Sequence, residues 1–292
     1  MAQPPLGCAI PMPSSEIDEN AGGAARIRLP AVAGGFYPGD REALARDVDA
    51  FINPATNRLR ASACMVPHAG YMYSGHVAGA VYSRIEPATR LLILGPNHTG
   101  YGEPLAINAT GGWRTPLGIA RIDEQLAGEL MRAFPLLRED ELAHRREHSI
   151  EVQLPFVQRV MGEFTFVPVC VGTGNLELLV NFGEAIAQVL QNSGDRILMI
   201  SSSDMNHYET DDITRIKDSQ AIAPILALDP VGLYEIVIRE RISMCGFAPT
   251  VAMLMACKRL GATRVELAKY ATSGDINGDR SHVVGYAGIL IT

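Results

Sequence analysis

Two spacings of apolar residues alternate along the chain and together predict a sheet covered by helices. Short runs that are apolar at nearly every position favour strands buried on both faces, whereas apolar residues every three to four positions favour amphipathic helices. The strand-like runs are residues 62–66, 90–95, 164–171 and 196–203. The helix-like segments are residues 41–52, 75–85, 124–134, 149–161, 176–190, 213–228 and 249–260. We therefore expect an α/β fold, with a mainly parallel or mixed sheet and helices on both faces.

The two ends of the chain depart from this alternation. Residues 1–27 are rich in Pro, Gly, Ala and Ser without an apolar period, which predicts a flexible N-terminal arm. Residues 265–274 and 282–292 have the pattern of closing strands, joined through the turn-rich GDINGDR. Because no repeat or linker interrupts residues 28–292, we expect that part to form a single domain.

The composition narrows the classes of partner and compartment. Lys plus Arg number 25 against 32 for Asp plus Glu, a net charge of -7, so we expect neither nucleic acid nor a membrane surface as partner. The five cysteines contain no C-x-x-C pair, which favours a reducing compartment over a disulfide framework. No apolar run approaches the ~18 residues of a spanning helix, and the first residues lack the pattern of a secretory signal. These features predict a cytoplasmic protein.

Chemistry-bearing side chains follow three of the predicted strands. His68 comes after ACMVP, His98 after LLILGPN, and Asp204 and His207 after ILMISSS. The carboxyl ends of parallel strands share one edge of a sheet, which is where open α/β proteins place their ligands. A single loop histidine is more often structural, but the repeated placement favours one cleft that contains all four residues.

Cys245 is the cysteine whose position in the sequence most favours a functional role. It lies in MCGFAP, just before a predicted helix, where the helix dipole favours a thiolate that can bind metal or react as a nucleophile. Cys64 and Cys170 lie inside apolar strands and Cys257 lies inside a helix, so we expect those three to be buried and inert.

One motif favours a different chemistry. His144 to His148 spells H-x-x-E-H, the inverted zinc-peptidase signature in which two histidines one helical turn apart bind zinc and the glutamate acts as base. That alternative needs a long helix and a third acidic ligand downstream, for which Glu235 is a candidate. The competing interpretation is a solvated charged helix with His144 exposed.

Eight segments, taken in order, resemble the Memo family. They are GFYPGD, VPHAGYMYSGH, LLILGPNH, WRTPLG, EHSIEVQLPF, ISSSDMNHY, MCGFAP and YATSG. The resemblance runs from about residue 28 to the C-terminus. It implies the α/β fold of the class III extradiol ring-cleaving dioxygenases, which contains a metal cleft.

The resemblance also implies the residues of a metal site. Metal ligation falls on His68, His98 and Cys245, with one metal ion per chain. Extradiol dioxygenases hold Fe(II) with two histidines and a carboxylate, whereas a Cys/His/His set is softer. We therefore expect iron first, with copper and zinc as alternatives.

The remaining implied residues surround the metal. The resemblance places His148, Asp204 and His207 around the cleft, where a histidine would move a proton and Asp204 would fix an imidazole tautomer. The predicted function is redox or oxygen-dependent chemistry on a small oxygenated ligand. The alternative is a module without enzymatic activity that binds a peptide or phosphopeptide. Relatives in prokaryotes also imply a radical-SAM system as partner.

Overall fold

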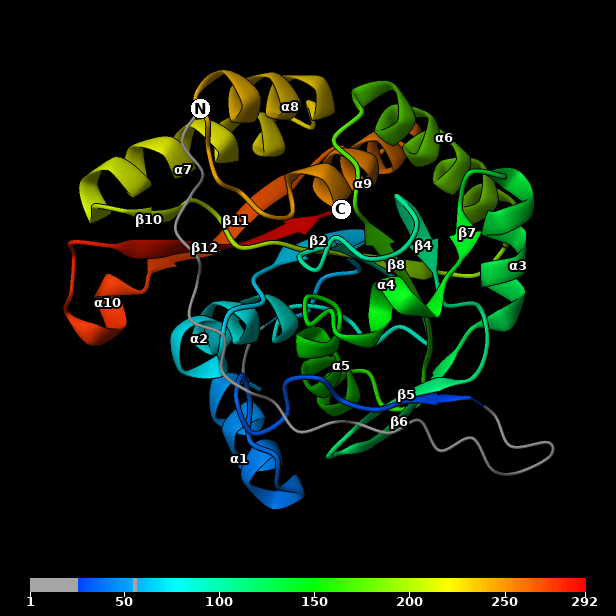
Figure 1. Cartoon of the computed structure of the whole chain (residues 1–292), viewed down its shortest axis with the longest axis horizontal. Helices are drawn as coiled ribbons and strands as arrows, with labels where there is room; N and C mark the ends of the chain where they lie inside the picture. Colours follow the sequence, from blue (N-terminus) through cyan, green and yellow to red (C-terminus); the bar gives the residue numbers. More distant parts are fainter. Residues whose placement is uncertain (1–25, 55–56) are drawn as a thin grey trace.

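The computed structural model describes residues 26–54 and 57–292, whose strands join in one mixed sheet (Figure 1). The strands are β1 (Ile27–Arg28), β2 (Ala63–Val66), β3 (Arg90–Pro96), β4 (Leu105–Ile107), β5 (Gly112–Thr115), β6 (Gly118–Ile122), β7 (Arg138–Glu139), β8 (Thr165–Val171), β9 (Ile197–Ser202), β10 (His207–Glu209), β11 (Val265–Thr272) and β12 (Val283–Ile291). Their order across the sheet is β1, β5, β6, β8, β3, β9, β2, β12, β10, with β11 beside β12 and with β4 paired to β7 and β8.

Helices cover both faces of this sheet. They are α1 (Arg41–Phe51), α2 (Tyr71–Tyr82), α3 (Glu124–Ala133), α4 (Glu141–Arg145), the 3₁₀ turn η1 (Glu151–Gln153), α5 (Leu154–Val160), α6 (Leu176–Asn192), α7 (Asp211–Leu226), α8 (Pro230–Arg239), α9 (Phe247–Arg259) and α10 (Gly274–Asn277). In Figure 1, α6, α7, α8 and α9 lie above the sheet, and α1, α2 and α5 lie below it. Among the described residues, no helix is both long enough and apolar enough to span a bilayer.

The centre of the sheet confirms the prediction from apolar runs. Strands β8, β3, β9 and β2 are parallel neighbours, and in β3 every residue after Arg90 is buried. Successive side chains of a strand point to opposite faces. Accordingly, Leu92 and Leu94 pack in the core between the sheet and helices α6 and α9. Leu91 and Ile93 pack in the core on the other face, between the sheet and helices α1, α2 and α5. A strand buried on both faces needs no polar alternation, which is why it appears as a continuous apolar run.

Some elements differ from the sequence expectation. The helix expected over residues 149–161 is a 3₁₀ turn followed by α5, which has Pro155 in its first turn, where a missing N–H is tolerated. Helix α8 was not predicted, although Asp229 caps it and Pro230 begins it. The segment expected to be a simple turn, GDINGDR, contains the short helix α10. Most of the predicted arm lies outside the described residues, but Ile27 belongs to β1 and pairs with β5.

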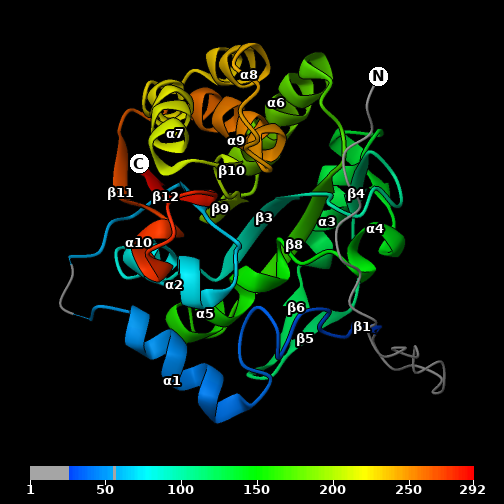
Figure 2. The same cartoon turned by 60° about the vertical axis from the view of Figure 1, so that its left-hand side comes forward.

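The carboxyl ends of the central strands lie side by side and carry the candidate site. Strand β2 ends at Val66, β3 at Pro96 and β9 at Ser202, and His68, His98 and Asp204 each follow two residues later. Val66 and Ser202 are register partners. Figure 2, turned by 60° from Figure 1, shows β3, β8 and β9 ending toward the same side of the molecule. The topology thus brings together side chains that are far apart in the sequence.

Candidate metal centre

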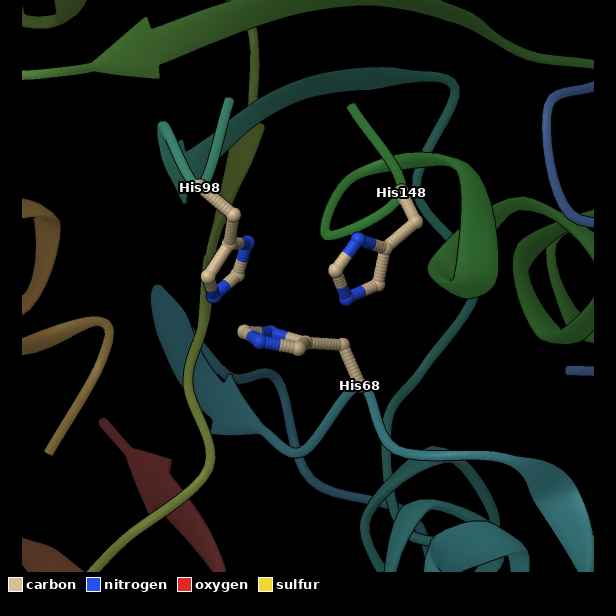
Figure 3. Close-up of side chains that lie close together, drawn as sticks. All are labelled: His68, His98 and His148. Carbon is tan, nitrogen blue, oxygen red and sulfur yellow. The ribbon is translucent and has the colours of Figure 1, made fainter. Parts of the chain in front are cut away.

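Three histidines converge above the carboxyl edge of the sheet (Figure 3). His68 follows β2, His98 follows β3, and His148 lies in the segment between α4 and η1. One ring nitrogen from each lies within 4.8 Å of the others. The rings of His98 and His148 are nearly parallel, with centroids 4.7 Å apart, and His68 presents its ring edge-on to both. His68 is buried and His98 is exposed, so the group opens to solvent on the His98 side.

Hydrogen bonds determine which nitrogen of His68 faces the centre. Its Nδ1 lies 2.9 Å from Ser202 Oγ, which donates its own proton to the Ser149 carbonyl at 2.6 Å. Gln153 Nε2 donates to the same hydroxyl at 2.8 Å. Because the hydroxyl proton is already used, His68 Nδ1 must be the donor. The lone pair of His68 is therefore on Nε2, which lies 3.2 Å from the Sγ of Cys245.

The buried carboxylate of Glu147 lies beside the Nδ1 atoms of the other two rings, as Ser202 lies beside the Nδ1 of His68. Glu147 Oε1 accepts from His98 Nδ1 at 2.9 Å and lies 3.4 Å from His148 Nδ1. A carboxylate only accepts hydrogen bonds, so the Nδ1 of His98 carries the proton and its Nε2 is left with the lone pair. In Figure 3 the lower nitrogens of both rings point toward His68. Glu147 was not among the predicted site residues, although it is the glutamate of the H-x-x-E-H motif.

The protein surroundings keep most of this group uncharged. Burial lowers the pKa of His68 well below its usual value, and nearby imidazoles lower it further. Burial also lowers the pKa of His148, to about 4, although the charge of Glu147 opposes this. For His98, burial is outweighed by the hydrogen bond and charge of Glu147, so its pKa is raised. Neutral imidazoles with free lone pairs are the form that binds metals.

Asp204 holds the main chain at this site and does not contact an imidazole ring through any of its hydrogen bonds. Its Oδ1 accepts from the backbone N–H of His68 at 2.8 Å and of Ala69 at 3.2 Å. Burial raises the pKa of Asp204, while the charge of His207 and these backbone bonds oppose that rise. The Nδ1 partners of His68 and His98 are Ser202 and Glu147, so the role of Asp204 in fixing a tautomer stays a prediction.

His207 lies near the group at the start of β10. Its backbone N–H donates to Ser243 Oγ at 2.7 Å, and its Nδ1 lies 2.8 Å from the Ser243 carbonyl. A carbonyl only accepts, so Nδ1 carries the proton and Nε2 carries the lone pair. The charge of His207 influences the pKa values of both His68 and Asp204, which places it within electrostatic range of the cleft.

Cys245 directly precedes α9, as the sequence predicts, but its chemistry differs from the expectation. Burial, followed by the charge of Asp204, raises the pKa of its thiol well above the usual value. The sulfur also accepts from the Asp204 N–H at 3.3 Å. Burial therefore opposes the thiolate that a position just before a helix was expected to favour. Cys64, Cys170 and Cys257 are buried, as expected.

The donor set fits a transition metal ion. Sulfur and nitrogen ligands of a tetrahedral zinc, at bond lengths near 2.3 and 2.1 Å, lie about 3.6 Å apart. The 3.2 Å between Cys245 Sγ and His68 Nε2 is close to that spacing, and His98 and His148 add lone pairs on the same side. Three imidazoles and a thiol are the ligands expected for iron, copper or zinc.

The H-x-x-E-H segment does not form a peptidase site. Helix α4 ends at Arg145, so the two histidines do not share a helical face. His144 is 1% exposed and packs edge-on against Trp113, which contradicts the expected exposure on a charged helix. Glu235 is exposed on α8, and neither it nor His144 belongs to the histidine group found among the described residues.

A separate surface cavity of about 770 Å³ lies at the opposite, amino-terminal edge of the sheet, beside the start of β8. Its lining includes Arg41, Arg121 and Arg159, and contains none of the candidate ligands. Cavity size therefore does not identify the site in this fold; the convergence of donor atoms does.

Comparison with known proteins shows a single family. The model of the Memo-like protein family matches residues 28–290. A MEMO1 family protein of Methanosarcina barkeri is 43% identical over 91% of this chain and 100% of its own length. One from Methanopyrus kandleri is 45% identical over 90% of this chain and 98% of its own length.

A solved structure shows the same fold at low sequence identity. An uncharacterised protein of Escherichia coli K12 matches with a TM-score of 0.50 and 11% identity, covering 76% of this chain and 98% of its own. The likeness supports the α/β architecture alone. The family model and the archaeal relatives show the family itself: this chain belongs to the Memo-like protein family.

Proposed function

We propose that the protein binds one transition metal ion in this cleft and uses it for redox or oxygen-dependent chemistry on a small oxygenated ligand. The observation that carries the proposal is the convergence of His68, His98 and His148, whose ring nitrogens lie within 4.8 Å of one another. The Nδ1 atoms of His68 and His98 already have hydrogen-bond partners, so the lone pairs of these two rings are on Nε2.

The ligands in this proposal are His68, His98 and Cys245. The sulfur of Cys245 faces the lone pair of His68, which supports the two as joint donors. Iron is the proposed metal, with copper or zinc as alternatives, since a Cys/His/His set suits all three. A bound ion would supply a Lewis-acid centre for the oxygenated ligand and, as iron or copper, a redox centre.

Protein groups around the ion would then exchange protons with the bound ligand and hold the metal-binding side chains in place. His148 lies beside His98, is neutral, and carries a lone pair that can accept a proton. His207 Nε2 is a second candidate base, because the Ser243 carbonyl holds the proton on its Nδ1. Asp204 would keep His68 in place through the main chain. Both imidazoles are free to exchange a proton with a ligand that enters from the open His98 side.

Elemental analysis of protein purified without oxygen or chelators tests the site. We expect about one metal ion per chain, severe loss of metal in His98→Ala and Cys245→Ser, and near-normal metal content in His148→Gln. His282→Ala, at an exposed histidine, is the control and should behave as wild type. Full occupancy in both His98→Ala and Cys245→Ser would overturn the proposal, while loss in His148→Gln with retention in Cys245→Ser would make the ligands three histidines.

Oxygen consumption by the metal-loaded protein tests the chemistry. Turnover that falls about 10 to 100-fold in His207→Gln, with the metal retained, supports the proposed base. A loaded protein that reduces no oxygen with any catechol or ascorbate donor, yet binds peptides in a metal-dependent manner, would instead establish the alternative of a binding module.

A further inference from the structure

Glu147 is a buried carboxylate placed between two of the imidazoles. We propose that Glu147 is the positioning residue of the metal centre: it holds His98 and His148 as Nδ1–H tautomers and directs their Nε2 atoms into the cleft. The inference rests on the proposed metal site, although its first test uses metal-free protein. Glu147 is not itself proposed as a ligand or as a base.

The contacts of Glu147 fix its own position first. Oε2 accepts from the backbone N–H of His98 at 2.5 Å. Oε1 accepts from the backbone N–H groups of His148 at 2.9 Å and Ser149 at 3.0 Å. These bonds join the loop after β3 to the segment after α4, so the carboxylate connects the two backbones that carry the rings. With 1% of its side chain exposed, it has no room to take another position.

The same oxygen then aligns the rings. His98 Nδ1 donates to Oε1 at 2.9 Å, and His148 Nδ1 lies 3.4 Å from that atom. The two rings beside this oxygen are nearly parallel, at 21°, and 4.7 Å apart. A histidine that ligates a metal usually donates its other N–H to a carboxylate or carbonyl, which fixes its tautomer and strengthens it as a donor. Here one carboxylate serves two rings.

Both ring contacts of Glu147 use the same oxygen. Oε1 faces the Nδ1 atoms of His98 and His148 and two backbone N–H groups, whereas Oε2 accepts from the backbone N–H of His98. A glutamine can keep its carbonyl oxygen at the Oε1 position and turn its NH₂ toward the His98 N–H, so Glu147→Gln retains an acceptor for the rings and serves as a control. Glu147→Leu removes that acceptor at similar volume. His68 does not depend on Glu147, because its Nδ1 donates to Ser202, and Ser202→Ala is therefore the matched variant for the third ring.

Nitrogen NMR of metal-free protein labelled at histidine reads the tautomers directly. At a pH where the imidazoles are neutral, wild type should show His68, His98 and His148 as Nδ1–H forms. Glu147→Leu should convert His98 and His148 to mixtures or to the Nε2–H form without changing His68, whereas Glu147→Gln should keep the wild-type tautomers. Ser202→Ala should change His68 alone. A merely structural role for Glu147 would alter stability without this selective exchange.

Zinc titration measures the consequence for binding. We expect affinity to fall about 10 to 100-fold in Glu147→Leu and by a smaller factor in Glu147→Asp, which keeps the charge on a shorter side chain. Unchanged tautomers and unchanged affinity in a folded Glu147→Leu protein would overturn the proposal. If that variant does not fold, wild type alone decides, because Nε2–H tautomers at His98 and His148 would also overturn it. Failure of wild type to bind any metal would instead count against the proposed function. The tautomers measured in metal-free protein would still decide the role of Glu147.

Discussion

Two histidines of the H-x-x-E-H segment illustrate how surroundings determine chemistry at the residue scale. His148 has a carboxylate beside its Nδ1 and an open centre beyond its ring. His144 is enclosed, and neither of its ring nitrogens has a hydrogen-bond partner in the described structure. Burial, and next the charge of Arg28, lower the pKa of His144 to about 3, and the nearby backbone of Ala106 offsets this only in part. One imidazole is thus available for chemistry, while the other destabilises the fold as the pH falls.

The first prediction concerns this buried histidine. Its folded pKa lies below the value near 6.5 of the unfolded chain, so the unfolded state takes up the proton first. Stability is therefore lost as the pH falls from about 6.5 toward 3, and by pH 5 this group alone accounts for about 2 kcal/mol. We expect His144→Phe to reduce that loss by a similar amount and to leave metal content unchanged.

Urea unfolding at pH 7.5 and pH 5 checks the prediction, with His282→Phe as an exposed control that keeps the wild-type profile. Parallel pH profiles for wild type and His144→Phe would show that the imidazole is not protected from protonation. Loss of metal in His144→Phe, with His98→Ala unaffected, would restore the peptidase hypothesis.

At the scale of elements, strand β1 anchors the segment that contains His148. Arg28 donates to the carbonyl of His144 at 2.8 Å and to that of Glu147 at 2.5 Å. It also pairs with Glu151 at 2.7 Å, and its guanidinium lies 4.1 Å from the centre of the Trp113 ring. The pair is almost completely buried, with side-chain exposures of 8% and 1%. A strand of two residues therefore provides more of the contacts that hold this segment in place than its length suggests.

The second prediction compares two neighbouring arginines. Removing one partner of a buried ion pair leaves an uncompensated charge and costs about 3 to 5 kcal/mol. We expect Arg28→Ala to lower the free energy of unfolding by that amount and to weaken metal binding, since the segment carrying His148 loosens. Arg26 also forms an ion pair, with Glu141, but the two side chains are 75% and 45% exposed.

Arg26→Ala should accordingly cost about 0.5 kcal/mol or less. Urea unfolding of both variants under the same conditions provides the measurement. Equal effects from the two substitutions would mean that burial of the Arg28 pair adds nothing to stability.

At the scale of the whole molecule, the parallel sheet is the scaffold of the site. The strand ends after β2, β3 and β9 supply His68, His98 and Asp204, and the loop before α9 supplies Cys245. A metal ion bound by His68, His98 and Cys245 joins elements that are distant in the chain. Because the unfolded chain cannot assemble the site, binding should stabilise the entire fold.

The third prediction follows from this linkage. Metal at a hundred times its dissociation constant should add about 2.7 kcal/mol to the free energy of unfolding, which is a rise of a few °C in the melting temperature of a protein of this size. Differential scanning calorimetry with and without metal checks this, and a chelator should reverse it. An equal rise in His98→Ala would mean that the ion binds somewhere else.

Local patterns in the sequence are sufficient for much of this molecule. The buried strands β3, β8 and β9 and the amphipathic helices α1, α3 and α6 were predicted close to their observed bounds, because apolar spacing depends on which faces an element buries. The Memo resemblance is confirmed by the family model over residues 28–290. The ligand set of His68, His98 and Cys245 stays a prediction.

Tertiary structure decided how the polar groups pair, and so which chemistry each residue can perform. From the sequence alone it followed that His68, His98, Asp204 and His207 lie near one edge, since parallel strands end together. Spacing could not show that Glu147 reaches back to His98, 49 residues earlier in the chain, or that burial raises the pKa of the Cys245 thiol. Hydrogen-bond partners and desolvation depend on contacts between distant segments, and only the folded chain creates those contacts.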